Sequence, residues 1–402
     1  MKYPVLLILF LLSDVCRADE PYTLLSPEKQ EMLRLEREAY EAEHEKLRTN
    51  WIAPLNLSGT YDYDRSAQGE FFSTTETVSG SITQDIFRSG GITYQIAYAD
   101  AKKERESLSR QKEIALLNRQ LFISILEYRK ALFEKEQTAL KLKNKEIEVA
   151  IKRHLFDAGK ADITELNNAL MEKSAELKSL AAIEYSIAEQ RYEIAKISDV
   201  AADSFELPRF ELIDRKAYLD EELDLRYTRA NTQTQRYAYE VTASDYLPSI
   251  ALNAALGYRR YDPKERTGDY DGHYYNTGIS LTLPLSYNAS STVQEARALY
   301  LKEAASVADK RRSLEGSYAQ AVEKIKSFEE TIALIRRNLS LYDDLIGAIR
   351  SGVEAGTKTG YDLQTLQNSR SIEEFDIRIY EIDIQIELAK LHFALNPSKE
   401  LP

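Results

Sequence analysis

The stretch EAGTKTGYDLQTL, residues 354–366, interrupts a sequence that otherwise reads as one long helix. It contains two glycines, Gly356 and Gly360, among strong helix formers. Because a glycine in an exposed helix interior costs about 1 kcal/mol relative to alanine, the stretch favours a turn. Thr359 and Asp362 have the spacing of a capping box, in which two side chains satisfy free N–H groups at a helix start. The stretch therefore predicts the tip of a helical hairpin, followed at once by a capped helix.

A similar pattern occurs about one half-chain earlier. The stretch FDAGKADITEL, residues 156–166, places Gly159 197 residues before Gly356, and its Asp162 and Glu165 again have capping-box spacing. Pro54 and Pro248, which each precede an alternating segment, are 194 residues apart. The chain is therefore predicted to be a tandem duplication. Each half is expected to run helix, strand, turn, strand, very long helix, glycine turn and long helix.

The segments near residues 54–87 and 248–285 show the alternation of β-strands. For example, Leu55, Leu57, Tyr61 and Tyr63 alternate with Asn56, Ser58, Thr60 and Asp62. Such a pattern gives a strand one apolar and one polar face. Four strands of about 10 residues fit a membrane β-barrel with a wet lumen. They fit a soluble hairpin lying on a helical body equally well.

Between the strands and the glycine turns, each half predicts a rod-like helix. Residues 93–156 contain neither proline nor glycine, and their apolar residues recur every three or four positions, close to a heptad repeat. At 1.5 Å per residue, such a segment forms a rod of about 95 Å. The second half repeats it from about residue 291 to 353. Because the rods are largely polar, they need lateral packing against neighbours.

The first 18 residues resemble a secretory signal. Lys2 precedes an unbroken apolar run from Val5 to Leu12, and Ala18 ends a triplet suited to cleavage. Cleavage after Ala18 is the expectation. Cys16, the only cysteine, is an alternative site of lipid attachment.

The composition argues against several functional classes. The net charge is −12 and no basic stripe is present, which argues against a nucleic-acid partner. The four histidines are scattered over different elements without metal-ligand spacing. The sequence has neither a phosphate-binding loop nor a nucleophile elbow. We therefore expect no enzyme activity, no metal site and no cofactor.

The order and spacing of these features resemble the TolC-type outer-membrane efflux protein family. The resemblance covers the whole mature chain and is carried by GTKTGYDLQTL, FDAGKADITELNNA, QDIFRSGG and LTLPLSYNASSTVQEARA. It implies a mainly α fold and a homotrimer, in which each protomer gives four strands to a shared twelve-stranded barrel and coiled-coil hairpins to a long periplasmic tunnel. It also implies two partners, a periplasmic adaptor (membrane fusion) protein at the tunnel tip and an inner-membrane pump of RND, ABC or MFS type.

Physical chemistry independently requires several copies in a membrane. A lone sheet of four strands has two open edges, which are not viable in lipid, and about eight strands are needed to close a filled barrel. The chain must therefore oligomerise if its strands enter the outer-membrane lipid.

The resemblance assigns roles to residues at the two tips. Asp362 aligns with an acidic ring that lines the narrowest part of the family's tunnel, although a helix-capping role also accounts for it. A second acidic residue of the family's pattern is Thr365 here. Lys358 aligns with a basic residue that latches the closed tip and Glu165 with an acidic one on the other hairpin, so we expect a Glu165–Lys358 contact. The residues expected to contact the adaptor are Ala158, Gly159, Lys160, Ala161, Gly356 and Thr357, although turns need glycine in any case.

The expected organisation is a signal peptide at 1–18, a first repeat at 19–197, a linker at 198–223, a second repeat at 224–396 and a tail at 397–402. The expected function is a passive exit duct in the cell outer membrane, with a long periplasmic extension, for a tripartite efflux or type I secretion system. Its cargo would be small molecules or peptides. A secreted coiled-coil scaffold without channel activity is the alternative.

Overall fold

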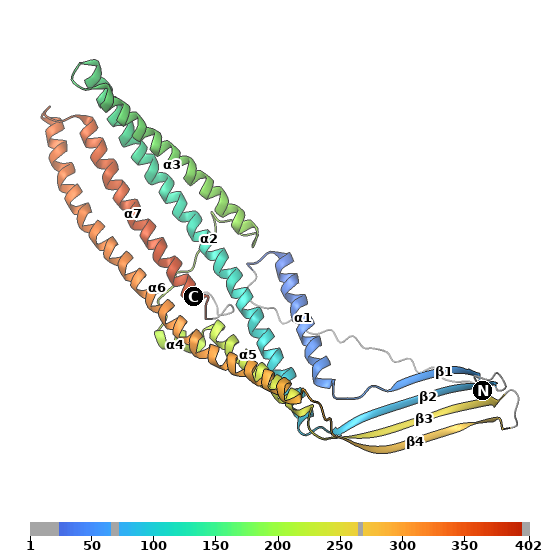
Figure 1. Cartoon of the computed structure of the whole chain (residues 1–402). Helices are drawn as coiled ribbons and strands as arrows, with labels where there is room; N and C mark the ends of the chain where they lie inside the picture. The colour runs from blue at the N-terminus through green and yellow to red at the C-terminus, as the bar shows by residue number, and fades with distance from the viewer. Residues whose placement is uncertain (1–23, 66–71, 264–267, 396–402) are drawn as a thin grey trace.

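The computed structural model describes residues 24–65, 72–263 and 268–395. The expected signal peptide, Cys16 and the tail at 397–402 lie outside these residues. The described chain is an elongated panel, with a sheet at one end and two helical tips at the other (Figure 1).

The same series of elements runs twice along the chain. The first series is α1 (Pro27–Thr49), β1 (Asn56–Arg65), β2 (Phe72–Phe87), α2 (Gly91–Asp157) and α3 (Ile163–Ala195). The second series is α5 (Leu223–Ser244), β3 (Ser249–Pro263), β4 (Tyr270–Thr282), α6 (Ala289–Glu354) and α7 (Gly360–His392), and the short helix α4 (Arg215–Glu221) precedes it. The two long helices have 67 and 66 residues, and the helices after the tips have 33 residues each.

The strands form one antiparallel sheet in the order β1-β2-β3-β4. The register pairs Leu57 with Gly80, Gly80 with Leu256, and Leu256 with Tyr275, which places these residues in one row on one face. That face is apolar and at least 44% exposed at each of these residues: Leu57, Tyr61, Tyr63, Val78, Leu252, Leu256, Tyr275, Ile279 and Leu281. The opposite face carries Ser58, Thr60, Ser79, Thr83, Asn253 and Ser280. The predicted alternation, and the mainly helical fold with a four-stranded sheet, are therefore confirmed.

The helices extend the sheet as a layer four elements wide. Along one side of α2 lie α1 near the sheet and α3 toward the tips, and along its other side lie α5 and α7. The helix α6 packs beyond α5 and α7 and forms the far edge. The side-by-side order is therefore α1 or α3, then α2, then α5 or α7, then α6 (Figure 1).

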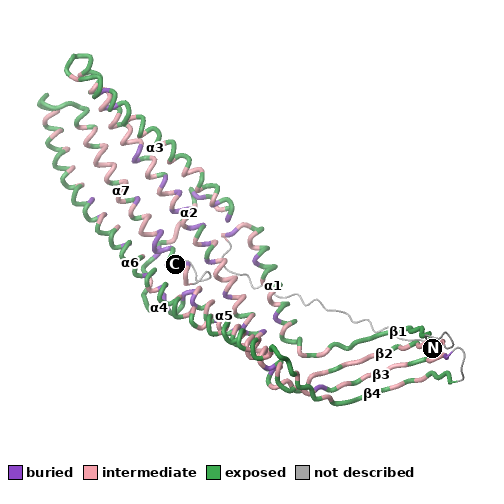
Figure 2. Tube along the Cα trace, in the orientation of Figure 1, coloured by how far each residue is buried: buried purple, intermediate pink, exposed green. Residues whose placement is uncertain are grey.

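The densest core lies at the middle of the panel, where the linker between the repeats crosses the helices. Phe122 of α2 is 1% exposed, and its ring lies 5.7 Å from that of Phe205, 5.9 Å from that of Phe210 and 5.0 Å from that of Phe393. The Tyr128 hydroxyl donates to Asp203 at 2.5 Å. Figure 2 shows that buried residues gather in the helical body, while the sheet and the tips are mostly half-buried or exposed.

Asp224, near the start of α5, joins the long helices of both repeats. Its carboxylate accepts hydrogen bonds from the ammonium groups of Lys112 on α2 and Lys310 on α6. Partial burial raises the pKa of Asp224, but the two ammonium groups outweigh this effect, so the pKa lies below its usual value.

We expect Asp224→Asn to lower the free energy of unfolding of the helical body by about 1 to 2 kcal/mol, because charge-assisted hydrogen bonds are lost at a partly exposed site. Since the folded pKa lies below the unfolded one, this contribution is present above the unfolded pKa and is lost as the pH falls through the folded pKa. Thermal melting followed by circular dichroism in detergent, at neutral and acid pH, measures both effects. The control is Asp309→Asn, an exposed residue beside Lys310; equal midpoints for the two variants would contradict the role of Asp224.

Candidate functional site: the two helical tips

Both long helices end in the same hydrogen-bond pattern. At the first tip, the Lys160 N–H donates to the Leu155 carbonyl at 2.7 Å; at the second, the Thr357 N–H donates to the Gly352 carbonyl at 2.8 Å. The residue just before each donor is a glycine with a positive φ angle: Gly159 has φ 68° and Gly356 has φ 71°. This is the Schellman arrangement, in which a residue in the left-handed region ends the helix. The backbone therefore favours glycine at both tips.

The residues predicted to contact an adaptor lie at the extreme end of the panel. Ala158, Gly159, Lys160, Gly356 and Thr357 are exposed, whereas Ala161 is half-buried. A Cβ placed on Gly159 or Gly356 would meet no atom within 4 Å. The tip surface is therefore free for a contact in a single chain, and the adaptor contact itself stays a prediction.

The second tip has the capping box that the sequence indicates. The Thr359 hydroxyl accepts from the Asp362 N–H at 3.3 Å, and the Asp362 carboxylate accepts from the Thr359 N–H at 2.9 Å. The carboxylate also accepts from the Thr359 hydroxyl at 2.8 Å. The hydrogen bonds from the Thr359 backbone and hydroxyl, with a smaller contribution from Lys358, hold the pKa of Asp362 below its usual value.

The first tip is capped differently from the second. Asp162 accepts from the Thr164 N–H at 3.3 Å, but the Glu165 carboxylate pairs with Lys152 of α2 at 2.6 Å. The capping box suggested by the Asp162–Glu165 spacing therefore does not form, because a lysine of the opposite charge lies within reach of Glu165. In addition, no contact between Glu165 and Lys358 occurs among the ion pairs of the described residues. Within one chain, Lys152 takes the place that was predicted for Lys358.

Two grooves place Asp362 and the linker on opposite faces of α7. Asp362, Thr365 and Ser369 line a groove of about 580 Å³, which Lys141 and Lys145 of α2 also line. Arg378, Glu381 and Gln385 line a second groove, of about 740 Å³, which the linker borders through Leu207. Ser369 and Arg378 are nine residues apart, which leaves them about half a turn apart on a helix of 3.6 residues per turn. One face of the panel therefore carries the linker and the other carries Asp362.

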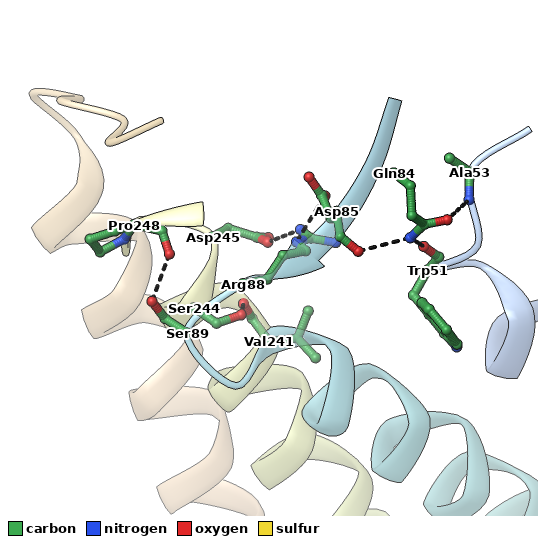
Figure 3. Close-up of polar contacts among 10 residues, drawn as sticks. All are labelled: Trp51, Ala53, Gln84, Asp85, Arg88, Ser89, Val241, Ser244, Asp245 and Pro248. Atoms are coloured by element: carbon green, nitrogen blue, oxygen red, sulfur yellow. Dashed lines mark hydrogen bonds and ion pairs between the residues drawn. The ribbon is translucent and has the colours of Figure 1, made fainter. Parts of the chain in front are cut away.

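At the far end of the helices, a polar network joins the sheet to the helical body (Figure 3). Arg88, directly after β2, pairs with Asp245 at the end of α5 at 2.7 Å and with Asp85 at 3.6 Å. The Ser89 hydroxyl donates to the Pro248 carbonyl at 2.7 Å. Gln84 accepts from the Ala53 N–H at 2.9 Å. The network locks the turn after β2 in the first repeat to the turn before β3 in the second.

The sequence alone did not predict this network. QDIFRSGG carries part of the family resemblance, but Arg88 and Asp245 are 157 residues apart, so no local spacing signals their contact. In the sequence, the run Ser89-Gly90-Gly91 indicates a sharp turn at this place. In the structure, the φ angles of Ser89 and Gly90 are 48° and 89°.

Within residues 24–65, 72–263 and 268–395, no group of three or more His, Cys, Asp or Glu side chains is arranged to hold a metal ion. None of the helices described there combines the length and the apolar character needed to span a bilayer.

Comparisons with known proteins agree with this geometry. The family model "Outer membrane efflux protein" matches residues 216–396, which hold the second repeat. No curated protein sequence matches the chain. Among solved structures, the outer membrane protein VceC of Vibrio cholerae has a TM-score of 0.70 at 15% identity, covering 91% of this chain and 92% of that one.

Two outer membrane channels are also similar to this chain. CmeC of Campylobacter jejuni has a TM-score of 0.72 at 12% identity and covers 94% of this chain and 85% of that one. MtrE of Neisseria gonorrhoeae, solved in an open state, has a TM-score of 0.65 at 14% identity and covers 91% of this chain and 85% of that one. The resemblance to the TolC-type efflux family that the sequence indicates is confirmed, and the structural likeness extends over both repeats.

We expect Gly356→Ala to destabilise the second tip by about 1 kcal/mol, because alanine disfavours the left-handed backbone while its Cβ meets no clash. Hydrogen exchange of the Thr357 amide, which bonds to the Gly352 carbonyl, should become about fivefold faster, as expected for such a change in free energy. The matched control is Gly360→Ala, at the first position of α7, where the backbone is not left-handed. Faster exchange in the control alone would contradict the assignment.

Proposed function

We propose that this chain, which has the fold of outer membrane efflux channels and matches their family model over residues 216–396, forms the exit duct of an export system. Three copies would build one tube that crosses the outer membrane and extends into the periplasm. An adaptor would dock at the tips and connect the tube to an inner-membrane pump. The duct would be passive, without catalytic chemistry, and the pump would select the cargo.

The observation that carries the proposal is that both long edges of the panel are unfinished. In the sheet, β1 and β4 each pair on one side only. In the helical layer, the edge helix α3 carries apolar residues at heptad-like spacing that are at least 42% exposed: Ile163, Leu170, Leu177, Tyr185 and Tyr192. The other edge helix, α6, exposes Leu334, Leu341 and Leu345. Regularly spaced apolar residues on an edge helix are typical of a helix-packing seam.

Edge-to-edge contacts between copies would complete both the sheet and the helical layer. A contact between α3 of one copy and α6 of the next is heterologous, and such contacts close into rings when the rotation permits. Three copies, the number that the family resemblance implies, would bring twelve strands together. Because about eight strands form a filled barrel, twelve would leave a water-filled lumen.

The two faces of the panel suggest how it would be oriented in such a tube. The apolar face of the sheet suits lipid and the polar face suits a wet lumen. We place the linker on the outside of the tunnel, where it does not obstruct the path, so the opposite face, with Asp362, lies inside. Three copies of Asp362 near the axis would form a ring of negative charge and favour cations. Thr365, which lines the same groove as Asp362, adds no second ring of charge.

The alternative, a secreted scaffold, leaves the apolar face of the sheet in water. Leu57, Leu256, Tyr275 and Ile279 are 69–87% exposed on that face. Soluble proteins rarely expose a continuous apolar face of this kind. Fractionation separates the two proposals: a duct remains with the outer-membrane pellet and needs detergent, whereas a scaffold leaves with the aqueous extract.

We expect Leu177→Glu, in the apolar stripe of α3, to shift the detergent-solubilised protein from trimer toward monomer, because it buries a charge in the seam between copies. Size-exclusion chromatography with light scattering measures the number of chains per particle. Ser179→Glu adds the same carboxylate at an exposed position on another side of α3, so it should leave the trimer intact. A wild-type protein that runs as a monomer in detergent would overturn the trimer.

We expect Asp362→Asn to reduce the preference for cations while keeping the capping box, because the asparagine side-chain oxygen still accepts from the Thr359 N–H but carries no charge. The reversal potential across a planar bilayer under a salt gradient measures this preference. Asp162→Asn, at the N-cap of α3 on the other hairpin, removes a carboxylate near the first tip; it is the control and should have the smaller effect. An unchanged reversal potential in Asp362→Asn would leave Asp362 with the capping role alone.

A further inference from the structure

The groove of about 740 Å³ at the middle of the panel combines an apolar floor with four arginines. The arginines come from four different segments: Arg129 from α2, Arg209 from the linker, Arg336 from α6 and Arg378 from α7. The floor is formed by Leu126, Phe133, Leu207, Ile332 and Ile382. Two carboxylates, Glu329 and Glu381, also line the groove, so it keeps a surplus of two positive charges in a chain whose net charge is −12.

The arginines are only partly neutralised by the chain itself. The Arg378 guanidinium stacks on the rings of Phe133 and Phe375, 5.5 and 5.8 Å from their centroids. Arg336 has one loose ion pair, with Glu381 at 3.6 Å, and both side chains are more than half exposed. Arg129 donates to the carbonyl of Phe205. Arg209 is exposed and has no hydrogen-bond or ion-pair partner among the described residues. A guanidinium stacked on an aromatic ring keeps its N–H donors free for a carboxylate or a phosphate.

We propose that this groove binds an acidic peptide segment of a periplasmic partner protein, one that carries apolar side chains between its carboxylates. The carboxylates would pair with the arginines on the rim, and the apolar side chains would cover the floor, as when an amphipathic segment lies in a groove. The assignment of the partner to the periplasm depends on the proposed function, which places this face on the outside of the tunnel.

The size and position of the groove favour a peptide over other anions. An inorganic anion would leave the apolar floor uncovered. A membrane surface is out of reach, because Phe133 lies 42 residues after Gly91, which corresponds to about 60 Å of helix between the sheet and the groove.

The test uses the full-length protein in detergent and a fluorescein-labelled amphipathic peptide of glutamate, leucine and alanine, with binding followed by fluorescence anisotropy. We expect Arg336→Glu to weaken binding by about tenfold, and added salt to weaken binding to the unaltered protein. Arg209→Glu, in the exposed linker, should act in the same direction without disturbing a helix. The control is Lys216→Glu, which makes the same change of charge at an exposed residue of α4 that does not line the groove.

Three outcomes would overturn the proposal. The first is an equal loss of binding in Arg336→Glu and Lys216→Glu. The second is equal binding of a peptide in which lysine replaces glutamate. The third is complete displacement of the peptide by octyl phosphate at an equal concentration, which would assign the groove to a small anionic amphiphile. Light scattering on the same samples reports the oligomeric state, so a failure of the trimer is recognised separately from a failure of the groove.

Discussion

The constraint on which the rest of this structure depends is that both long edges of the panel lack partners within one chain. A sheet of four strands with an apolar face is stable neither in water nor in lipid while β1 and β4 lack partners. The duplication indicates how the edge strands β1 and β4 could pair with those of other copies. Within the chain, β2 of the first repeat pairs with β3 of the second, so a first repeat already meets a second repeat once. Pairing of β4 with β1 of another copy would form the same kind of junction in the other order. Three chains would then act as six similar units around one axis.

The two kinds of junction differ in their chemistry. Inside the chain, the junction between sheet and helices is fixed by Arg88, Asp245 and Ser89 (Figure 3). The corresponding segment between β4 and α6 lies at the edge of the panel, and it exposes Leu285 at 88% and Tyr287 fully. The internal junction therefore relies on directed polar contacts, which determine how sheet and helices meet. The edge segment instead offers apolar area, whose burial is non-directional and proportional to the area covered.

The features that could be read from the sequence are those with local causes. Gly159 and Gly356 indicate the tips because a helix that ends in the left-handed region needs glycine there. The alternation in the strands indicates a two-faced sheet because side chains on a strand point to opposite sides in turn. In contrast, the pairing of Glu165 with Lys152 depends on how two helices lie against each other at the first tip. The aromatic cluster of Phe122, Phe205 and Phe393 joins three separate parts of the chain, so no periodic pattern in the sequence predicts it.

The contacts between the repeats change character along the panel. At the middle, aromatic rings and apolar side chains bury the seam between α2, the linker and α7. Toward the tips, polar pairs become prominent in the α2–α7 seam beside the ring contact of Phe133 and Phe375. Lys130 pairs with Asp383, Gln137 donates to Asp376, and Asn368 donates to Asn144. Each hydrogen bond replaces one with water, so a neutral bond contributes about 1 kcal/mol and a bond to a charged group about 1.5–3 kcal/mol, whereas apolar burial accumulates with area. The panel is therefore held most firmly at its middle. Toward the tips the directed polar pairs fix the register of α2 against α7.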